Sequence, residues 1–252
     1  MNNDNGKYSG DFEAVCEPAL IRIEATFHPA PGFEYLETVP LGETEPCPTE
    51  PMISVQAELK PVAGSIHRFS VEEYHRLTKA GILTTDDKVE LLEGWLVQKK
   101  SHNPQQDTSL QLMNEILHKD LPQEWCVRIR SAVTFRDSEP EPDVAVVRSD
   151  EGTRIYFARH PQANDIGMLT EIADATLLGD RADKGRIYAR AGVPIYWIVN
   201  LIDQHIEVYE QPSGPTTAPA YAKTTTYRAG DSVPLVLDGV TVATFAVSDL
   251  LP

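Results

Sequence analysis

Three charged residues stand in segments whose neighbours predict buried structure: Asp143, Glu171 and Lys184. Asp143 opens the apolar run DVAVV, and Glu171 lies inside the equally apolar MLTEIAD. A carboxylate buried without a partner is costly, and two carboxylates on neighbouring strands repel each other. A divalent cation removes both penalties, since Mg²⁺ prefers one or two carboxylates plus water. We therefore expect Asp143 and Glu171 to bind Mg²⁺ or Mn²⁺.

Lys184 belongs to residues 181–191, which predict a helix that ends at Gly192. It precedes Ile187 and Tyr188 by three and four residues, so we expect it on their inward-facing side. From there its ammonium can reach the two carboxylates. Metal ions polarise a phosphodiester and activate water, and a cation beside that water orients the hydroxide. The three residue types together therefore suit metal-dependent phosphodiester hydrolysis.

Each of these residues has a plainer interpretation when taken alone. Asp143 follows Pro142 and suits the start of a strand, while Glu171 suits a strand-edge carboxylate paired with an arginine. Lys184 on its own is typical of a solvated helix position. Only the combination of the three favours a catalytic site.

The elements that must position this site follow from periodicity and turn residues. Ser70 followed by Glu73 is a capping box, which predicts a helix that ends near Gly81. Residues 107–119 predict a second helix capped by Asp107, with Leu110, Met113 (or Leu112), Ile116 and Leu117 on its apolar face. Strands are expected at 125–135, 143–147, 168–174, 193–201 and 205–211, and hairpin turns at Glu93-Gly94 and Asp238-Gly239.

Residues 1–60 differ from the rest of the chain in composition. They contain seven prolines and 11 acidic against 3 basic residues, with a single candidate strand at 19–27. Such a composition is typical of loosely packed chain. We therefore expect an acidic, proline-rich extension over residues 1–62 and a folded domain with a β-rich tail over residues 63–252.

Charge and sequence motifs limit the class of function. The net charge of −16 argues against general electrostatic binding of nucleic acid. No apolar run is long enough to span a bilayer and no signal peptide is visible, so we expect a cytoplasmic protein. The three cysteines form no C-x-x-C pair, and no phosphate-binding glycine motif occurs. We expect surface positions for four histidines without metal-ligand spacing: His102, His118, His160 and His205.

These residues resemble the PD-(D/E)xK nuclease superfamily and, more narrowly, the bacterial Uma-two family of restriction-endonuclease-like proteins. Five segments carry the resemblance in order, and they reach from about Phe69 to Pro212. They are VELLEG (89–94), SEPEPDVAVVR (138–148), LTEIADATL (169–177), DRADKGRIYARAGVPIYWIVNL (180–201) and IEVYEQP (206–212). The resemblance implies an α/β fold with a restriction-endonuclease-like core, in which helices flank a mixed central sheet.

The resemblance also implies roles for particular residues. It makes Asp143 and Glu171 the metal ligands and gives Glu90 a supporting position. The lysine of the usual E-x-K unit is replaced by Ala173, and Lys184 from the following helix stands in for it. Where relatives carry a histidine, Gln106 or a neighbour stands here, so this protein either lacks that function or uses Gln106 for it.

The implied activity is Mg²⁺- or Mn²⁺-dependent hydrolysis of DNA, with DNA as the substrate and no membrane partner. A homodimer would let two sites address two strands. Two alternatives stay open at this point. One is a catalytically silent module of the same fold that binds nucleic acid or a protein partner, which the negative charge favours. The other is a hydrolase of RNA, a nucleotide or another phosphoester.

Overall fold

The computed structural model describes residues 10–16, 19–25, 66–99, 101–149 and 153–252. The chain divides into two compact units, Met1–Val62 and Ala63–Pro252. In the first unit, β1 (Gly10–Cys16) and β2 (Ala19–Ala25) form an antiparallel hairpin. The strand expected at 19–27 is therefore found, whereas its partner β1 was not predicted.

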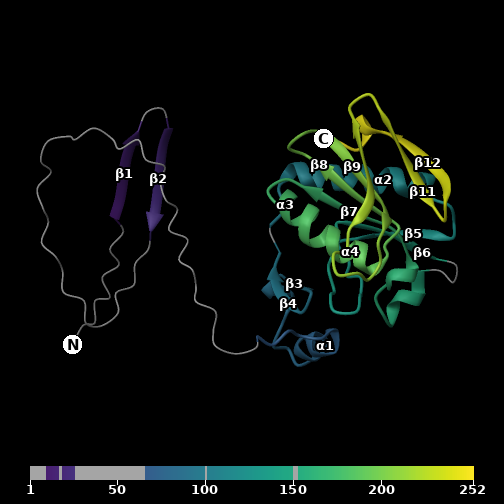
Figure 1. The fold of residues 1–252 in the computed structure, drawn as a ribbon, viewed down its shortest axis with the longest axis horizontal. Coiled ribbons are helices and arrows are strands. Elements are labelled where there is room, and N and C mark those ends of the chain that lie inside the picture. The colour runs from purple at the N-terminus through teal and green to yellow at the C-terminus, as the bar shows by residue number, and fades with distance from the viewer. Residues whose placement is uncertain (1–9, 17–18, 26–65, 100, 150–152) are drawn as a thin grey trace, which may run out of the picture. The chain divides into compact units, whose positions relative to one another are not determined.

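A six-stranded mixed sheet forms the centre of the second unit (Figure 1). Its strands lie in the order β10-β9-β8-β7-β6-β5, and all neighbours are antiparallel except β7 and β8. The bounds are β5 (Trp125–Ile129), β6 (Val144–Arg148), β7 (Ile166–Ala173), β8 (Ile195–Asn200), β9 (His205–Pro212) and β10 (Tyr221–Arg228).

Parallel neighbours cannot be joined by a tight turn, so the chain between β7 and β8 crosses over as helix. This crossover consists of α3 (Leu177–Gly179), a π-type turn (Asp180–Lys184) and α4 (Gly185–Ala191). It ends at Gly192, whose φ of 79° is a left-handed conformation that glycine adopts easily. The expected helix is confirmed, although it begins earlier than residue 181 and is irregular in its first turns.

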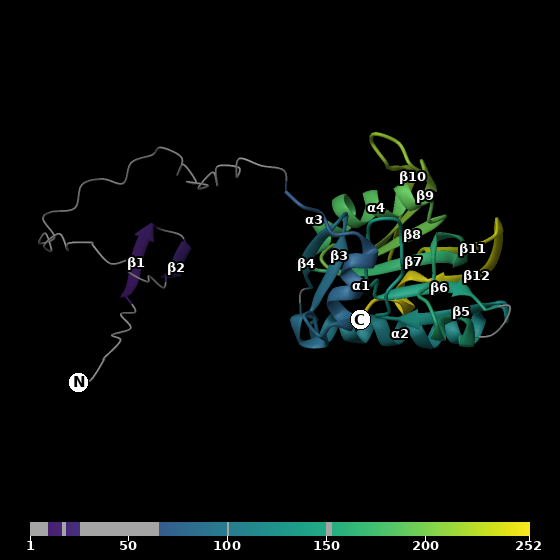
Figure 2. The ribbon, with the colours of Figure 1, turned by 90° about the horizontal axis from the view of Figure 1, so that it is seen from below.

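Helices cover both faces of the sheet, as the sequence predicts. One face packs against α2 (Pro104–Asp120) and the hairpin of β11 (Ser232–Leu237) and β12 (Val240–Ala246). The opposite face packs against the crossover. Figure 2 shows α2 and α4 on opposite sides of β7. Trp197 is fully buried on the α2 side, and Tyr188 and Tyr196 are fully buried on the α4 side.

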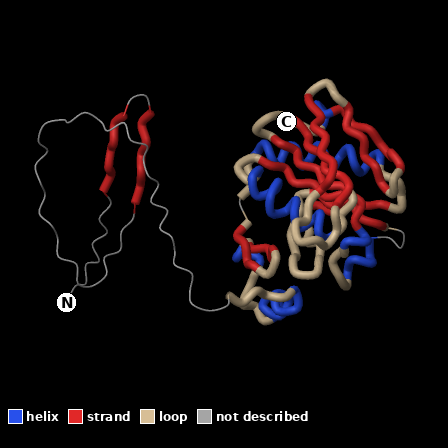
Figure 3. Tube along the Cα trace, in the orientation of Figure 1, coloured by secondary structure: helices blue, strands red, loops and turns tan. Residues whose placement is uncertain are grey.

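A smaller apolar cluster forms where α1 (Val71–Lys79) meets the hairpin of β3 (Val89–Leu92) and β4 (Trp95–Gln98). Leu91 is its fully buried centre. Loops, drawn in tan in Figure 3, gather between this part of the unit and the sheet. Short 3₁₀ turns occupy Thr85–Asp87, Thr153–Phe157, Ala163–Asp165 and Val247–Asp249.

Local signals predicted some boundaries well and others poorly. The Ser70 capping box is confirmed, as are both hairpin turns. The cap of α2 was wrong: the helix begins at Pro104 after Asn103, because Asn103 and Gln106 cap each other's backbone N–H groups. The strand expected at 125–135 ends at Ile129, and β10 was not predicted.

Among the described residues, no helix has the length and apolar character needed to cross a membrane.

Candidate functional site

Asp143 and Glu171 lie side by side on the central sheet. In the antiparallel pair of β6 and β7, Val144 faces Thr170, which places Asp143 opposite Glu171. Glu171 points to the face covered by the crossover, as do its alternate neighbours Leu169 and Ala173. Both carboxylates are buried, with side-chain exposures of 9% and 6%. The sheet register therefore brings together the two carboxylates that the sequence singled out.

The Asp143 carboxylate is held by the backbone of the neighbouring strand. Its Oδ2 accepts a hydrogen bond of 2.8 Å from the Ile172 N–H. Its Oδ1 faces two nitrogen-bearing side chains, with Arg130 Nε at 3.4 Å and His102 Nδ1 at 4.0 Å. His102 is exposed, as expected, but its position beside Asp143 was not predicted.

The Glu171 carboxylate is held from the crossover. Its Oε1 accepts a hydrogen bond of 2.7 Å from the Tyr188 hydroxyl and lies 3.0 Å from Lys184 Nζ. Lys184 and Tyr188 are four residues apart, so they share one side of the crossover. The inward direction expected for Lys184 is therefore found. Tyr188, which the sequence suggested only as a packing residue, is also a hydrogen-bond donor to the site.

Glu90 reaches the same place from the hairpin. Its Oε1 lies 3.6 Å from Lys184 Nζ, and its Oε2 accepts a hydrogen bond of 2.9 Å from the Glu141 N–H. Its polar partners in the described structure are thus Lys184 and the backbone just before Asp143. Glu90 touches the lysine of the site and not its pair of carboxylates.

Asp180 is a fourth acidic residue of the cluster, and sequence reasoning missed it. It is 5% exposed and lies close enough to Lys184 to raise the pKa of the ammonium. The available signal was its spacing of four residues before Lys184. That spacing is also typical of solvated ion pairs on helix surfaces, so it does not distinguish a buried group.

Burial and charge shift the pKa values of the central pair. Burial raises the pKa of Glu171 well above its usual range; Lys184 opposes the rise, while Asp180, Asp143 and Glu90 add to it. Burial alone would lower the pKa of Lys184, but the carboxylates of Glu171, Glu90 and Asp180 outweigh it and raise the pKa. When ionised, the four carboxyl groups of Asp143, Glu171, Glu90 and Asp180 outnumber the one ammonium of Lys184.

This excess negative charge and the oxygen donors fit a hard divalent cation. Asp143 and Glu171 would be its two side-chain ligands, and Mg²⁺ commonly completes such a set with water. Among the described residues, no three or more His, Cys, Asp or Glu side chains are grouped closely enough to enclose a metal ion. A cation held by Asp143 and Glu171 alone would keep further coordination positions open for water.

Gln106 lies behind the pair of Asp143 and Glu171. It is buried, and its Nε2 donates a hydrogen bond of 2.9 Å to the carbonyl of Ile172, the residue after Glu171. The same side chain caps α2 through Asn103. Gln106 thus ties the start of α2 to β7. Ala173, at the position of the usual E-x-K lysine, is fully buried and carries no functional group.

Arg130 joins the site through a strained backbone. Its φ is 42°, in the left-handed region that side chains other than glycine rarely adopt. Its terminal nitrogen donates a hydrogen bond of 2.7 Å to Asp107 Oδ1, while its Nε faces Asp143. Strained residues of this kind gather at functional sites because the surrounding contacts hold them in place.

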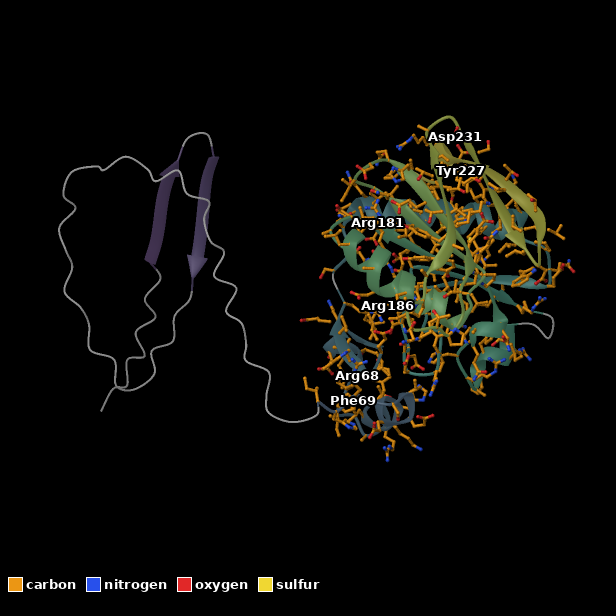
Figure 4. The ribbon with its side chains drawn as sticks, in the orientation of Figure 1. Arg68, Phe69, Arg181, Arg186, Tyr227 and Asp231 are labelled. Atoms are coloured by element: carbon orange, nitrogen blue, oxygen red, sulfur yellow. The ribbon has the colours of Figure 1, made fainter. Side chains whose placement is uncertain are left out.

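One expectation about histidines was wrong. His205 is 6% exposed, and its Nε2 lies 3.0 Å from Oε1 of the equally buried Glu207. Alternation along β9 turns both side chains toward the crossover, because residues two apart share a face. Arg181 of the crossover binds Glu207 through two nitrogens, at 3.0 and 2.5 Å. Figure 4 labels Arg181 on this segment.

The fold has a counterpart among solved structures. The crystal structure of a putative nuclease belonging to DUF820, from Anabaena variabilis ATCC 29413, superposes with a TM-score of 0.55 at 16% sequence identity. The match covers 72% of this chain and 97% of that chain. A likeness at this identity shows the fold, and the expected α/β class with helices around a mixed sheet is confirmed.

The family follows from the sequence comparison. A family model named Uma2, described as "Putative restriction endonuclease", matches residues 71–246. The chain therefore belongs to the Uma2 family. No curated protein matches the chain.

Proposed function

We propose that this protein is a Mg²⁺- or Mn²⁺-dependent endonuclease that hydrolyses DNA phosphodiester bonds at Asp143, Glu171 and Lys184. The observation that carries the proposal is the position of Lys184 Nζ, 3.0 Å from a carboxylate that lies beside Asp143 on the sheet. Family membership supports the same class of reaction.

In this proposal Asp143 and Glu171 hold the cation. When bound, the cation neutralises charge on the phosphate and lowers the pKa of a bound water. Lys184 sits at the edge of the carboxylate pair, where its ammonium donates hydrogen bonds to the attacking water and stabilises negative charge that develops on the phosphate. Its burial favours this function, because a charge acts more strongly where water is scarce.

The other residues keep the donors in place. The Ile172 N–H orients Asp143, and the Tyr188 hydroxyl orients Glu171. Glu90 keeps the Lys184 ammonium close to the pair and protonated, since a nearby carboxylate favours the charged form. These contacts fix each functional side chain from a different element, which is how a preorganised site is built.

The test is a cleavage assay on supercoiled DNA with Mg²⁺, Mn²⁺ or EDTA, using the wild type, Asp143→Asn and Glu171→Gln. Both variants keep the size of the side chain and remove the charge that binds metal. We expect metal-dependent cleavage by the wild type and loss of at least about 100-fold in each variant. Asp120→Asn, an exposed position at the end of α2, is the matched control and should cleave normally.

The alternative function is a catalytically silent module of the same fold, and the net charge of −16 favours it. Calorimetric titration with Mg²⁺ distinguishes the two. Binding of Mg²⁺ by the wild type but not by Asp143→Asn supports the proposed site. Equal cleavage by the wild type and both variants would overturn the assignment. A panel with RNA and simple phosphoesters defines the substrate.

A further inference from the structure

A polar pocket of about 340 Å³ opens between α1 and the loop that joins β5 to β6. Its ionisable lining consists of His75, Arg128, Arg130, Glu139, Glu141 and His160. Two members of this set contact the candidate site: Arg130 faces Asp143 through its side chain, and Glu141 donates its backbone N–H to Glu90. The rest of the pocket has no function in the hydrolysis proposed above.

Two of the lining side chains have buried nitrogens without a hydrogen-bond partner. They are Arg128 Nε and His160 Nδ1. The Arg128 guanidinium packs over the Tyr156 ring, 5.3 Å from its centroid, which fixes its direction without giving Nε an acceptor. A buried donor that lacks an acceptor is costly. Arg128 also lines the pocket, where an oxyanion could accept hydrogen bonds from the guanidinium and offset part of that cost.

The acidic residues of the pocket are already engaged by other partners. Both Glu139 oxygens lie within 2.9 Å of His75 Nε2, and Oε2 also accepts a hydrogen bond of 2.6 Å from Thr134. Glu141 pairs with Lys99 at 2.7 Å. These carboxylates therefore do not cancel the charge of Arg128. Arg128 and Arg130 line the pocket with two guanidinium groups, whose donors suit a phosphate oxyanion.

The pocket adjoins the carboxylate pair. Arg130 lines it and places its Nε 3.4 Å from Asp143 Oδ1. Glu141 lines it too, and its backbone N–H donates to Glu90. A ligand here lies one side chain away from Asp143. In a nucleic acid, a phosphate bound in this pocket would therefore neighbour the phosphate held at Asp143 and Glu171.

We propose that this pocket binds a backbone phosphate of the substrate nucleic acid, next to the phosphate that is cleaved, through Arg128 and His160. The inference rests on the proposed function. It adds a contact that binds the substrate strand at a second phosphate. It also accounts for nucleic-acid binding by a chain of net charge −16, because the cations that matter are local.

The experiment measures binding of a short fluorescein-labelled DNA duplex to the full chain by fluorescence anisotropy in EDTA, over a series of salt concentrations. We expect Arg128→Ala to weaken binding about tenfold and to reduce the slope of log affinity against log salt by about one. His160→Ala should weaken binding less. Arg228→Ala, which removes an exposed arginine from β10, is the matched control and should bind as the wild type does.

Arg128→Lys guards against a folding artefact, since it keeps the charge and the packing stem. It should retain the salt slope and lose part of the affinity, because a lysine cannot offer the planar fork of an arginine. Thermal unfolding of each variant establishes that it is folded. Wild-type affinity and slope in both Arg128 variants would overturn the proposal.

The two proposals fail in different ways. If the wild type cleaves DNA while Arg128→Ala and His160→Ala bind as tightly as it does, the endonuclease stands and the phosphate pocket falls. If the wild type does not cleave but Arg128→Ala still loses DNA affinity and salt slope, the pocket stands and the catalytic proposal falls.

Discussion

Glu171 and Glu207 occupy one row of the central sheet, on either side of Ile198. Each receives a cation from the same crossover: Lys184 lies 3.0 Å from Glu171, and Arg181 holds Glu207 through two nitrogens. A spacing of three positions in the π-type turn, from Arg181 to Lys184, thus separates a pairing at the candidate site from a structural one. This relationship underlies the first three predictions.

Lys184→Ala should abolish cleavage and strengthen the response to metal. The substitution removes the positive charge next to Glu171 and Glu90, so the remaining carboxylates repel each other more strongly and a cation relieves more repulsion. We expect cleavage to fall by at least about 100-fold and Mg²⁺ to raise the melting temperature more than in the wild type. Differential scanning fluorimetry with and without Mg²⁺ measures the second effect. Lys119→Ala, at an exposed position in α2, should change neither quantity.

Tyr188→Phe should lower cleavage, but by less than Lys184→Ala. The phenylalanine keeps the ring packing and removes only the hydrogen bond to Glu171 Oε1. Because burial raises the pKa of Tyr188 well above its usual range, the hydroxyl stays a donor throughout the neutral range. We expect a loss of about 0.5–1.5 kcal/mol in stability. Tyr209→Phe removes the corresponding bond to Glu207 and is the control. If both variants lowered cleavage equally, Tyr188 would have no specific function at the site.

Acid should destabilise the protein through Glu207. Burial alone would raise the pKa of this carboxyl, but hydrogen bonds from Arg181, Tyr209, Asn200 and His205 lower it to about 2. Its folded pKa is therefore below its unfolded value of about 4.5. The stabilisation is complete above the unfolded value and is lost as the pH falls toward 2. Urea unfolding across this range should show a shallower decline for Glu207→Gln than for the wild type.

Glu210→Gln is the matched control for that titration. It lies on the same strand, but its partner Lys223 is half exposed. Its profile should follow the wild type closely, since exposed ion pairs contribute little. Parallel curves for the wild type and Glu207→Gln would contradict the prediction.

Two glycines should respond to alanine in opposite directions. At Gly167 an added Cβ would lie 2.6 Å from the Trp125 ring and 2.7 Å from Leu237, so Gly167→Ala should cost about 1–3 kcal/mol through overpacking. At Gly179 an added Cβ meets nothing within 4 Å, and the backbone is already helical. Gly179→Ala should therefore stabilise by about 0.5–1 kcal/mol. Chemical denaturation of both variants is the measurement.

Much of the fold could be predicted from periodicity and caps. The strands at the centre of the sheet are continuous apolar runs, and the crossover has a clear amphipathic face with a closing glycine. The polar strand β10 (YAKTTTYR) could not be found in this way, because its exposed residues give no apolar alternation. The end of β5 at Ile129 depends on the strained Arg130, which no local preference of the sequence indicates.

The site was predictable to the extent that burial of charge is visible in a sequence. Asp143 and Glu171 stand out against apolar neighbours, and Lys184 follows from helical facing. Asp180 and Arg130 do not stand out, because each sits in a polar segment and acquires its contacts only when distant elements meet. The surface position expected for His205 was wrong for the same reason. Alternation of residue types alone does not distinguish a buried polar network from a surface strand.

The function of the π-type turn of the crossover depends on the number of residues that it contains. The loop at residues 213–220 can gain or lose residues at the surface without altering the sheet. Removing one residue between Arg181 and Lys184 would rotate one of the two side chains by about 100° relative to the other, since an α-helix turns once in 3.6 residues. Either Glu171 or Glu207 would then lose its cation. For anyone who aligns, shortens or redesigns such chains, this short segment tolerates changes of sequence far better than a change of length.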